Sequence, residues 1–99
     1  MSRVLCIVAG DCGVYVGLVD GGAEALRADG RVVMTRSRHL RRYYVAGRTS
    51  DGSVSDLAQL GLDPSSPSVT VVAEQPMAVV GVRRLLEVAP AAAASFGVL

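Results

Sequence analysis

The segment TRSRHLRRYYVAG, residues 35–47, concentrates the side chains that could do chemistry: four arginines, the only histidine of the chain and two adjacent tyrosines. Arginine guanidinium groups bind phosphates and carboxylates through paired hydrogen bonds, and tyrosine rings stack on nucleic-acid bases. If the segment continues as a regular strand, alternate residues share a face, so that Arg36 and Arg38, with Arg42 further along, give one basic face. The opposite face would carry Thr35, Ser37, His39 and Arg41.

Three roles fit this cluster. It could hold RNA, single-stranded DNA or a small nucleotide; it could join subunits or bind a partner protein, since arginine and tyrosine are enriched at interfaces; or it could be the solvated rim of a sheet. Acidic residues that could pair with the arginines across subunits are Asp51, Asp56, Asp63, Glu74 and Glu87. The net charge of only +1 gives no whole-molecule field for binding polyanions, so we favour the interface over nucleic acid and leave a nucleotide ligand open. The predicted contact residues are Arg36, Arg38, Arg41, Arg42, Tyr43, Tyr44 and Arg48.

The sequence contains no recognisable catalytic or cofactor-binding pattern. His39 is the only histidine, and nothing in the sequence brings a nucleophile and a carboxylate to it. Cys6 and Cys12 are not spaced as a zinc knuckle or a redox pair, and the phosphate-binding patterns GxGxxG and GK[ST] are missing. We therefore predict a protein that is not an enzyme and needs no metal or cofactor, with Cys6 in the core and Cys12 as a loop thiol that is not joined to it.

The length of the chain predicts a single domain, residues 1–99, and its composition predicts that this domain forms a homo-oligomer. Hydrophobic residues make up 51% of the chain and charged residues 19%, whereas an ordinary soluble domain carries about 25% charged residues. No apolar run reaches the roughly 18 residues that would cross a membrane, so we expect the apolar excess, above all AVVGV and SFGVL, to be buried between copies of the chain. Gly10 and Asp11 end the first apolar run too early for a signal peptide, which indicates a cytoplasmic protein.

Short strands between turn signals predict a mainly β fold. Residues 3–10 and 13–20 should pair, and Asp29-Gly30 is the strongest tight-hairpin signal, leading into a strand at 31–40. Residues 53–61 change to a helical period, with Ser53 or Ser55 as the N-cap and Gly61 at the end. Further strands are expected at 69–74 and 78–90, and one helical turn within 91–99. The predicted architecture is a small β-barrel or sandwich with one short helix.

The order of these segments resembles a family of small phage and prophage proteins of unknown function. The resemblance is carried by CGVYVGLVDG, ADGRVVMT, SRHLRRYYVAG, SVSDLAQLGL and VVGVRRLLEVAP, and it covers roughly residues 3–90. It implies a phage origin and a small β-rich fold, and it implies no known activity. The chain departs from the family pattern where family members carry tryptophan, because Tyr43 and Tyr44 stand there and the chain has no tryptophan.

Two functional hypotheses follow from these observations. In the first, the chain is a phage accessory protein in the host cytoplasm that binds a host factor or a small anionic or nucleotide ligand, for example to counter a host defence. In the second, it is a virion component such as a capsid decoration protein, whose apolar excess is buried on capsid subunits. We favour the first, because the turns are short and the chain has no long arms for clasping a lattice.

Overall fold

The computed structural model describes residues 3–11, 13–47 and 53–99. Within these ranges one antiparallel sheet is built from six strands, β1 (Arg3–Gly10), β2 (Gly13–Asp20), β3 (Val32–Arg42), β4 (Ser68–Val69), β5 (Met77–Val79) and β6 (Val82–Glu87). The helical elements described are the 3-10 helix η1 (Gly22–Ala25), the helix α1 (Val54–Leu60) and the 3-10 helix η2 (Pro90–Phe96). The mainly β class is confirmed, and closure of the sheet into a barrel stays a prediction.

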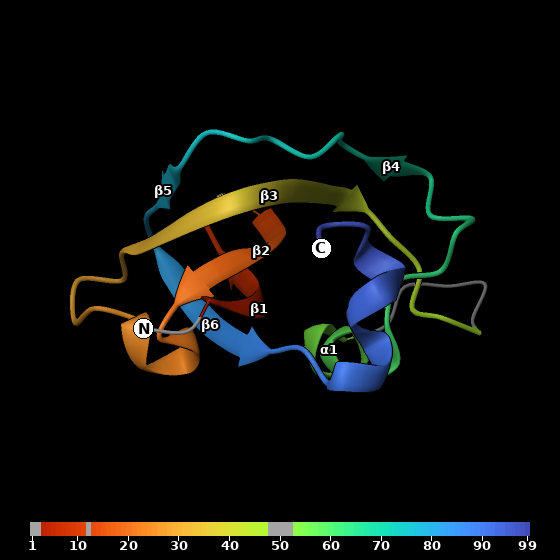
Figure 1. Ribbon diagram of the computed structural model, residues 1–99, viewed down its shortest axis with the longest axis horizontal. Helices are drawn as coiled ribbons and strands as arrows, with labels where there is room; N and C mark the ends of the chain where they lie inside the picture. Colours follow the sequence, from red (N-terminus) through yellow and green to blue (C-terminus); the bar gives the residue numbers. More distant parts are fainter. Residues whose placement is uncertain (1–2, 12, 48–52) are drawn as a thin grey trace.

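The sheet curls because two consecutive strands pair with different neighbours. Its order is β4-β3-β2-β1-β6, and β5, which precedes β6 along the chain, pairs with β3 (Figure 1). Only Val80 and Gly81 separate β5 from β6, so β3 and β1 must approach one another across this short link. The expected pairing of residues 3–10 with 13–20 is confirmed, in unbroken register from Gly10 opposite Gly13 to Arg3 opposite Asp20.

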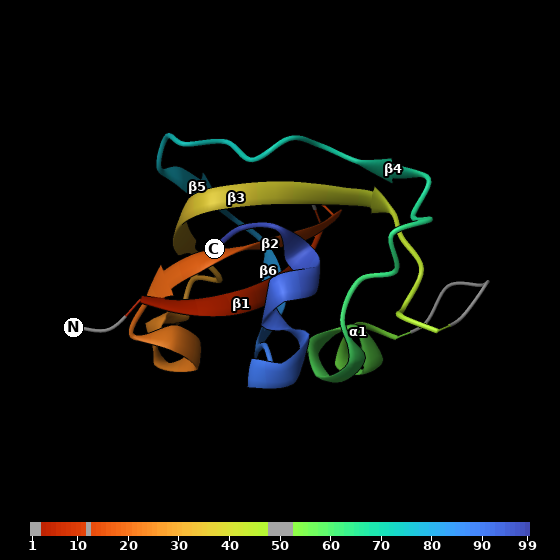
Figure 2. The same ribbon diagram turned by 45° about the vertical axis from the view of Figure 1, so that its right-hand side comes forward.

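Both faces of the sheet are buried, which explains why RVLCIVAG alternates so weakly in polarity. On one face an inner cluster lies within the curl and is formed by Cys6, Val8, Val19, Val32, Met34, Val79 and Val82. On the other face an outer cluster is covered by α1 and η2 and includes Leu5, Ile7, Val16, Leu40, Val45, Leu57, Ala58, Leu62, Ala92, Phe96 and Val98. Figure 2 shows η2 lying beside α1 on this covered face.

Strand β3 contains a bulge, and the expectation of a regular strand is wrong. Leu18 of β2 lies opposite Thr35, whereas Val16 lies opposite Arg38, so that β3 uses one more residue than β2 between these pairs. Arg36, within this step, has a φ of 49°, in the left-handed region that is uncommon for a residue with a side chain. An additional residue of this kind is what defines a β-bulge.

The bulge redistributes the residues of β3 between the two faces. Thr35 and Arg38 lie opposite β2 residues that pack with the outer cluster, so they share a side, against the expectation that they would face apart. Ser37 lies beside Gly17, and His39 lies opposite Tyr15, which packs on the inner cluster. The basic residues at the centre of β3 therefore turn towards the side that η2 covers.

The connection between β2 and β3 is longer than the tight hairpin expected at Asp29-Gly30, and that expectation is wrong. The chain first forms η1, where the N–H of Ala23 donates to a carboxylate oxygen of Glu87 at 3.0 Å. Asp29 and Gly30 then lie in a separate turn, closed by a hydrogen bond from the Gly30 N–H to the Arg27 carbonyl at 2.9 Å. The signal thus marks a turn correctly, but η1 takes the place of the partner strand.

The predicted helix and the later strands are confirmed only in part. Ser53 is the N-cap of α1, since its Oγ accepts from the Asp56 N–H at 3.1 Å, and Gly61 follows the last helical residue. Residues 78–90 contain β5 in part and all of β6, as expected, and η2 is longer than the one turn predicted. The strand expected at 69–74 is mostly absent. This segment contacts β3 at Thr70, opposite His39, and again at Ala73, opposite Ser37. Between these two contacts the segment uses three residues and β3 only two, so that regular pairing is not kept. Among the described residues, no helix has the length and apolar character needed to cross a membrane.

Candidate binding surface on β3

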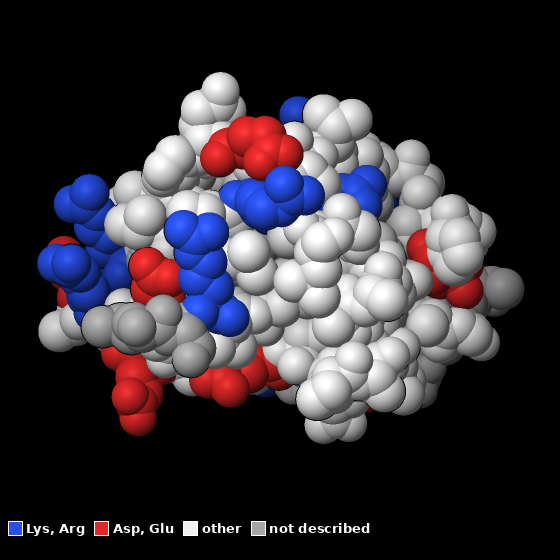
Figure 3. All heavy atoms as spheres, viewed as in Figure 1, with Lys and Arg blue, Asp and Glu red and all other residues white. Residues whose placement is uncertain are grey.

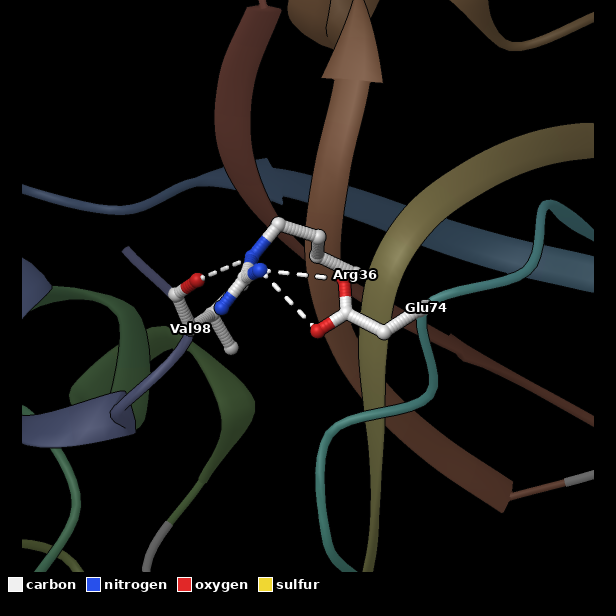
Figure 4. A network of polar contacts seen from close by, with 3 residues as sticks. All are labelled: Arg36, Glu74 and Val98. Carbon is white, nitrogen blue, oxygen red and sulfur yellow. Dashed lines mark hydrogen bonds and ion pairs between the residues drawn. The ribbon is translucent and has the colours of Figure 1, made fainter.

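The predicted arginine cluster divides into two pairs with different surroundings. Arg36 points towards the end of the chain, where its Nε donates to the main-chain carbonyl of Val98 at 2.8 Å (Figure 4). Its Nη1 donates to both carboxylate oxygens of Glu74, at 3.0 and 3.1 Å. The Glu74 ion pair, considered above as a contact between subunits, therefore forms within the chain.

Arg38 makes a second attachment to the same C-terminal segment. Its Nε donates to the Thr70 carbonyl at 2.8 Å and its Nη1 to the Phe96 carbonyl at 2.7 Å. Phe96 and Val98 are fully buried in the outer cluster, so the two arginines hold the main chain of residues whose side chains complete that core. The sequence does not indicate this role, because every residue type has a main-chain carbonyl and no pattern marks the ones that accept. The two acceptors also lie about 60 positions after the arginines in the chain.

Arg41 and Arg42, at the end of β3, form the second pair. Both side chains are exposed, and neither guanidinium group makes a hydrogen bond or an ion pair with any residue in the described ranges. A guanidinium group has five N–H donors and keeps its charge at any physiological pH. This end of β3 therefore presents two charged forks that are available to an anionic partner.

His39 and Tyr15 form an aromatic stack next to these arginines. Their ring centroids are 4.3 Å apart with an angle of 15° between the ring planes, and both side chains are half-buried. Gly13 leaves room for the imidazole, because a Cβ at that position would lie 2.8 Å from His39 Nε2. Burial, and then the charge of Arg41, lower the pKa of His39 below 6.5, so the ring is neutral at pH 7. Tyr15 was not predicted as a contact residue; the signal that could have found it is its pairing opposite His39.

The remaining predicted contact residues do not join this surface. Tyr43 is half-buried and packs against the outer cluster. Tyr44 is half-buried, and its main chain is fixed by Ser66 Oγ, which accepts from the Tyr44 N–H at 3.0 Å, and by the Asp63 N–H, which donates to the Tyr44 carbonyl at 2.9 Å. Arg48 lies outside the described residues.

A cavity of about 300 Å³ beside Arg38 has mixed charge and does not favour an anion. Asp63 lines it together with Ser66 and Ser95. Hydrogen bonds from the Ser65 side chain, then from the Ser65 main chain, lower the pKa of Asp63, so this carboxylate stays ionised. The cavity therefore combines an arginine that is already bonded with a negative charge.

Two features with possible chemistry, a metal-ligand cluster and a reactive thiol, were considered among the described residues. Among them no group of three or more His, Cys, Asp and Glu side chains could hold a metal ion. Cys6 is fully buried, and burial, followed by the charge of Glu87, raises the pKa of its thiol from 9.0 to about 12. A thiol with this pKa is protonated at pH 7 and is a poor nucleophile.

Comparison with known proteins gives no relative: no family model, no curated protein and no solved structure matches this chain. The resemblance to small phage proteins stays a prediction. The chemistry of the β3 surface is that of its own side chains, two exposed guanidinium groups beside a neutral imidazole and a phenol ring.

Proposed function

We propose that this chain is a non-enzymatic phage accessory protein that self-associates and binds a small anionic or nucleotide ligand, or a host factor with an anionic surface, through the end of β3. One observation carries the ligand part of this proposal. Four arginines lie close together in the sequence, but only Arg41 and Arg42 remain exposed and unpaired within the described part of the chain. The proposed contact surface is therefore smaller than the seven residues expected from the sequence.

Arg36 and Arg38 are left out of the proposed contact surface because their guanidinium groups already donate within the chain. Both donate to main-chain carbonyls of the C-terminal segment, and Arg36 is also paired with Glu74. A ligand that used either guanidinium would have to share it with these hydrogen bonds, which already occupy Nε and Nη1 of both residues. Arg41 and Arg42 have no such competitor in the described residues, and charge-assisted hydrogen bonds to an anion are the strongest that they can form.

Self-association is supported by exposed apolar side chains, though not by all the segments that suggested it. In SFGVL, Phe96 and Val98 are buried in the chain's own core, and of its three large apolar side chains only Leu99, 75% exposed, remains outside. Other exposed apolar residues are Leu26, Val33, Leu60, Val71 and Val80. Figure 3 shows a broad uncharged surface over η2, which is the kind of surface that subunits bury against one another. Native mass spectrometry at micromolar concentration should show a dimer or larger species, and a monomer alone would contradict this part.

The anion contact is tested by charge reversal at matched positions. Isothermal titration with inorganic polyphosphate should show binding that falls by about tenfold or more in the double variant Arg41→Glu, Arg42→Glu, because each lost charge-assisted hydrogen bond is worth about 1.5–3 kcal/mol. The control is Arg27→Glu, Arg31→Glu, which reverses two exposed arginines elsewhere. Equal loss in both variants would show non-specific attraction and overturn the proposed surface.

The accessory role is tested separately by measuring which proteins the phage particle contains. Mass spectrometry of purified virions from the parent phage should not find this chain at high copy number. Its presence at a fixed high copy number would instead support the capsid decoration hypothesis.

A further inference from the structure

The aromatic stack lies close to Arg41, the first of the two exposed arginines at the end of β3. His39 and Arg41 are two residues apart on β3, and because the pairing with β4 shifts register between Leu40 and Arg42, they lie at most about 7 Å apart along the strand. That Arg41 is near the imidazole is supported independently, since its charge contributes to the lowered pKa of His39. The surface therefore combines ring faces and a positive charge within the reach of one small ligand.

The two rings of the stack are supported by the fold and are partly exposed to solvent. Tyr15 packs on the inner cluster, and His39 lies over the backbone of Gly13, so both rings are held in place before any ligand arrives. Neither ring is fully buried. Rings fixed in this way lose little conformational freedom on binding, which favours stacking of a further flat ring.

We propose that the Tyr15–His39 stack, with Arg41 and Arg42, binds a nucleotide unit with an unpaired base, the base lying against the stacked rings and the phosphate on the arginines. This inference rests on the proposed function and names its ligand class. An anion without a ring would use only the arginines and would leave the stack without a role. A base is sequence-tolerant in this position, because every base has a π face.

Duplex DNA is a poorer fit than a single strand or a free nucleotide. Bases in a duplex are already stacked and paired, whereas the ring faces here need an exposed base. The net charge of +1 and the two exposed arginines at the end of β3 also provide few phosphate contacts for a long duplex. The shared chemistry of the two remaining sources, a free mononucleotide and a single strand, is a base linked to a phosphate.

The test separates the contribution of the base from that of the phosphates. Fluorescence anisotropy is measured with a short labelled oligothymidylate and with an abasic oligonucleotide of the same length and charge. Oligothymidylate should bind at least about fivefold more tightly, since stacking on an aromatic side chain is worth about that much per base or more. Competition with AMP and with unlabelled oligothymidylate then distinguishes the source: displacement by AMP indicates a free nucleotide, and displacement by the oligonucleotide alone indicates a single strand.

Variants of the stack assign the effect to these rings. Tyr15→Leu and His39→Gln should each lower the affinity for oligothymidylate by at least about fivefold and leave the abasic probe unchanged. Unchanged binding of the abasic probe guards against a loss caused by misfolding, and Tyr15→Phe, which keeps the ring, should lose less affinity for oligothymidylate than Tyr15→Leu does. Tyr44→Leu, at a half-buried tyrosine that takes no part in the stack, is the matched control and should change neither probe.

Two results would overturn the inference, and they differ in what they leave standing. If both probes bind equally, with dependence on Arg41 and Arg42 but not on Tyr15, the surface is an anion site without base stacking and the proposed function survives. If neither probe binds and polyphosphate does not bind either, the anion contact fails together with the nucleotide inference.

Discussion

Arg38 Nη1 donates to the main-chain carbonyl of Phe96 at 2.7 Å, joining β3 to η2 between residues 58 positions apart. Phe96 is fully buried in the outer cluster, so the hydrogen bond fixes the backbone of a residue whose ring is already held by packing. Arg36, two residues before Arg38, makes a similar hydrogen bond to the carbonyl of Val98, two residues after Phe96. The C-terminal segment is thus attached to the sheet by two guanidinium groups as well as by apolar contact.

Removal of one of these attachments should destabilise the fold. Arg38→Ala leaves the carbonyls of Thr70 and Phe96 without their donor, and an unsatisfied buried polar group costs about 1–3 kcal/mol. In a domain of this size each kcal/mol lowers Tm by about 4–8 °C. Arg42→Ala, at an exposed arginine, should stay within about 0.5 kcal/mol of the original protein. Urea and thermal unfolding measure both variants, and equal stabilities would contradict the attachment.

Two glycines with positive φ should differ in their tolerance of a side chain. At Gly61 a Cβ would lie 2.5 Å from Ser95 Oγ, which is itself held by accepting from the Leu62 N–H and donating to the Ala92 carbonyl. Gly61 also has φ 98° and ψ −178°, a region that only glycine commonly adopts. Gly61→Ala should therefore cost about 3 kcal/mol.

Gly47 is the control for this substitution. It has φ 79°, and a Cβ there would meet nothing within 4 Å. Gly47→Ala should cost about 1 kcal/mol, the backbone strain alone. Chemical denaturation of both variants tests the comparison, and a Gly47→Ala cost as large as that of Gly61→Ala would mean that contact with Ser95 is not the cause.

The Cys6 thiol should be inert in the folded protein. In a Cys12→Ser variant Cys6 is the only thiol, and it should react with a chromogenic disulfide reagent only after unfolding. The raised pKa of Cys6 also makes the free energy of unfolding depend on pH on the alkaline side. The stabilisation that comes from keeping this thiol protonated is complete below pH 9.0 and is lost as the pH rises from 9.0 towards about 12. Rapid reaction of the folded variant at pH 7 would contradict the burial of this side chain.

His39 should make stability depend on pH on the acid side. Its pKa is lowered in the folded state, first by burial and then by Arg41, so below about pH 6.5 the unfolded chain binds a proton that the folded chain resists. The contribution of His39 is therefore present above pH 6.5 and is lost as the pH falls through the lower pKa of the folded state. Urea unfolding at pH 8 and at pH 5 should show a smaller loss in His39→Gln than in the original protein, whereas identical losses would remove His39 as the cause.

The sequence predicted those features that depend on neighbouring residues. The β1–β2 pair follows from β-branched residues on both sides of a short turn, and the Ser53 cap follows from a hydroxyl three residues before an N–H that needs an acceptor. The register of β3 could not be read in this way, because a bulge is fixed by the strands on either side and not by the residues within it.

The sequence singled out the segment that contains the candidate surface, but it did not distinguish the arginines within that segment. Arg36, Arg38, Arg41 and Arg42 are alike as residue types, and what distinguishes them is the return of residues 90–99 to the sheet. Only after that segment is in place are two of the arginines bonded and two left exposed. The partner of His39 was missed for a related reason, since Tyr15 becomes its neighbour through strand pairing.

Because of the bulge at Arg36, β3 has one residue more than β2 in this part of their pairing. A chain lacking this residue could keep Leu18 opposite Thr35 and Val16 opposite Arg38 in regular alternation, with the same side chains on the same faces. It would lose the guanidinium that reaches Val98 and Glu74. At this position, therefore, a length difference of one residue alters how firmly the carboxyl-terminal segment is fastened and leaves the architecture of the sheet unchanged.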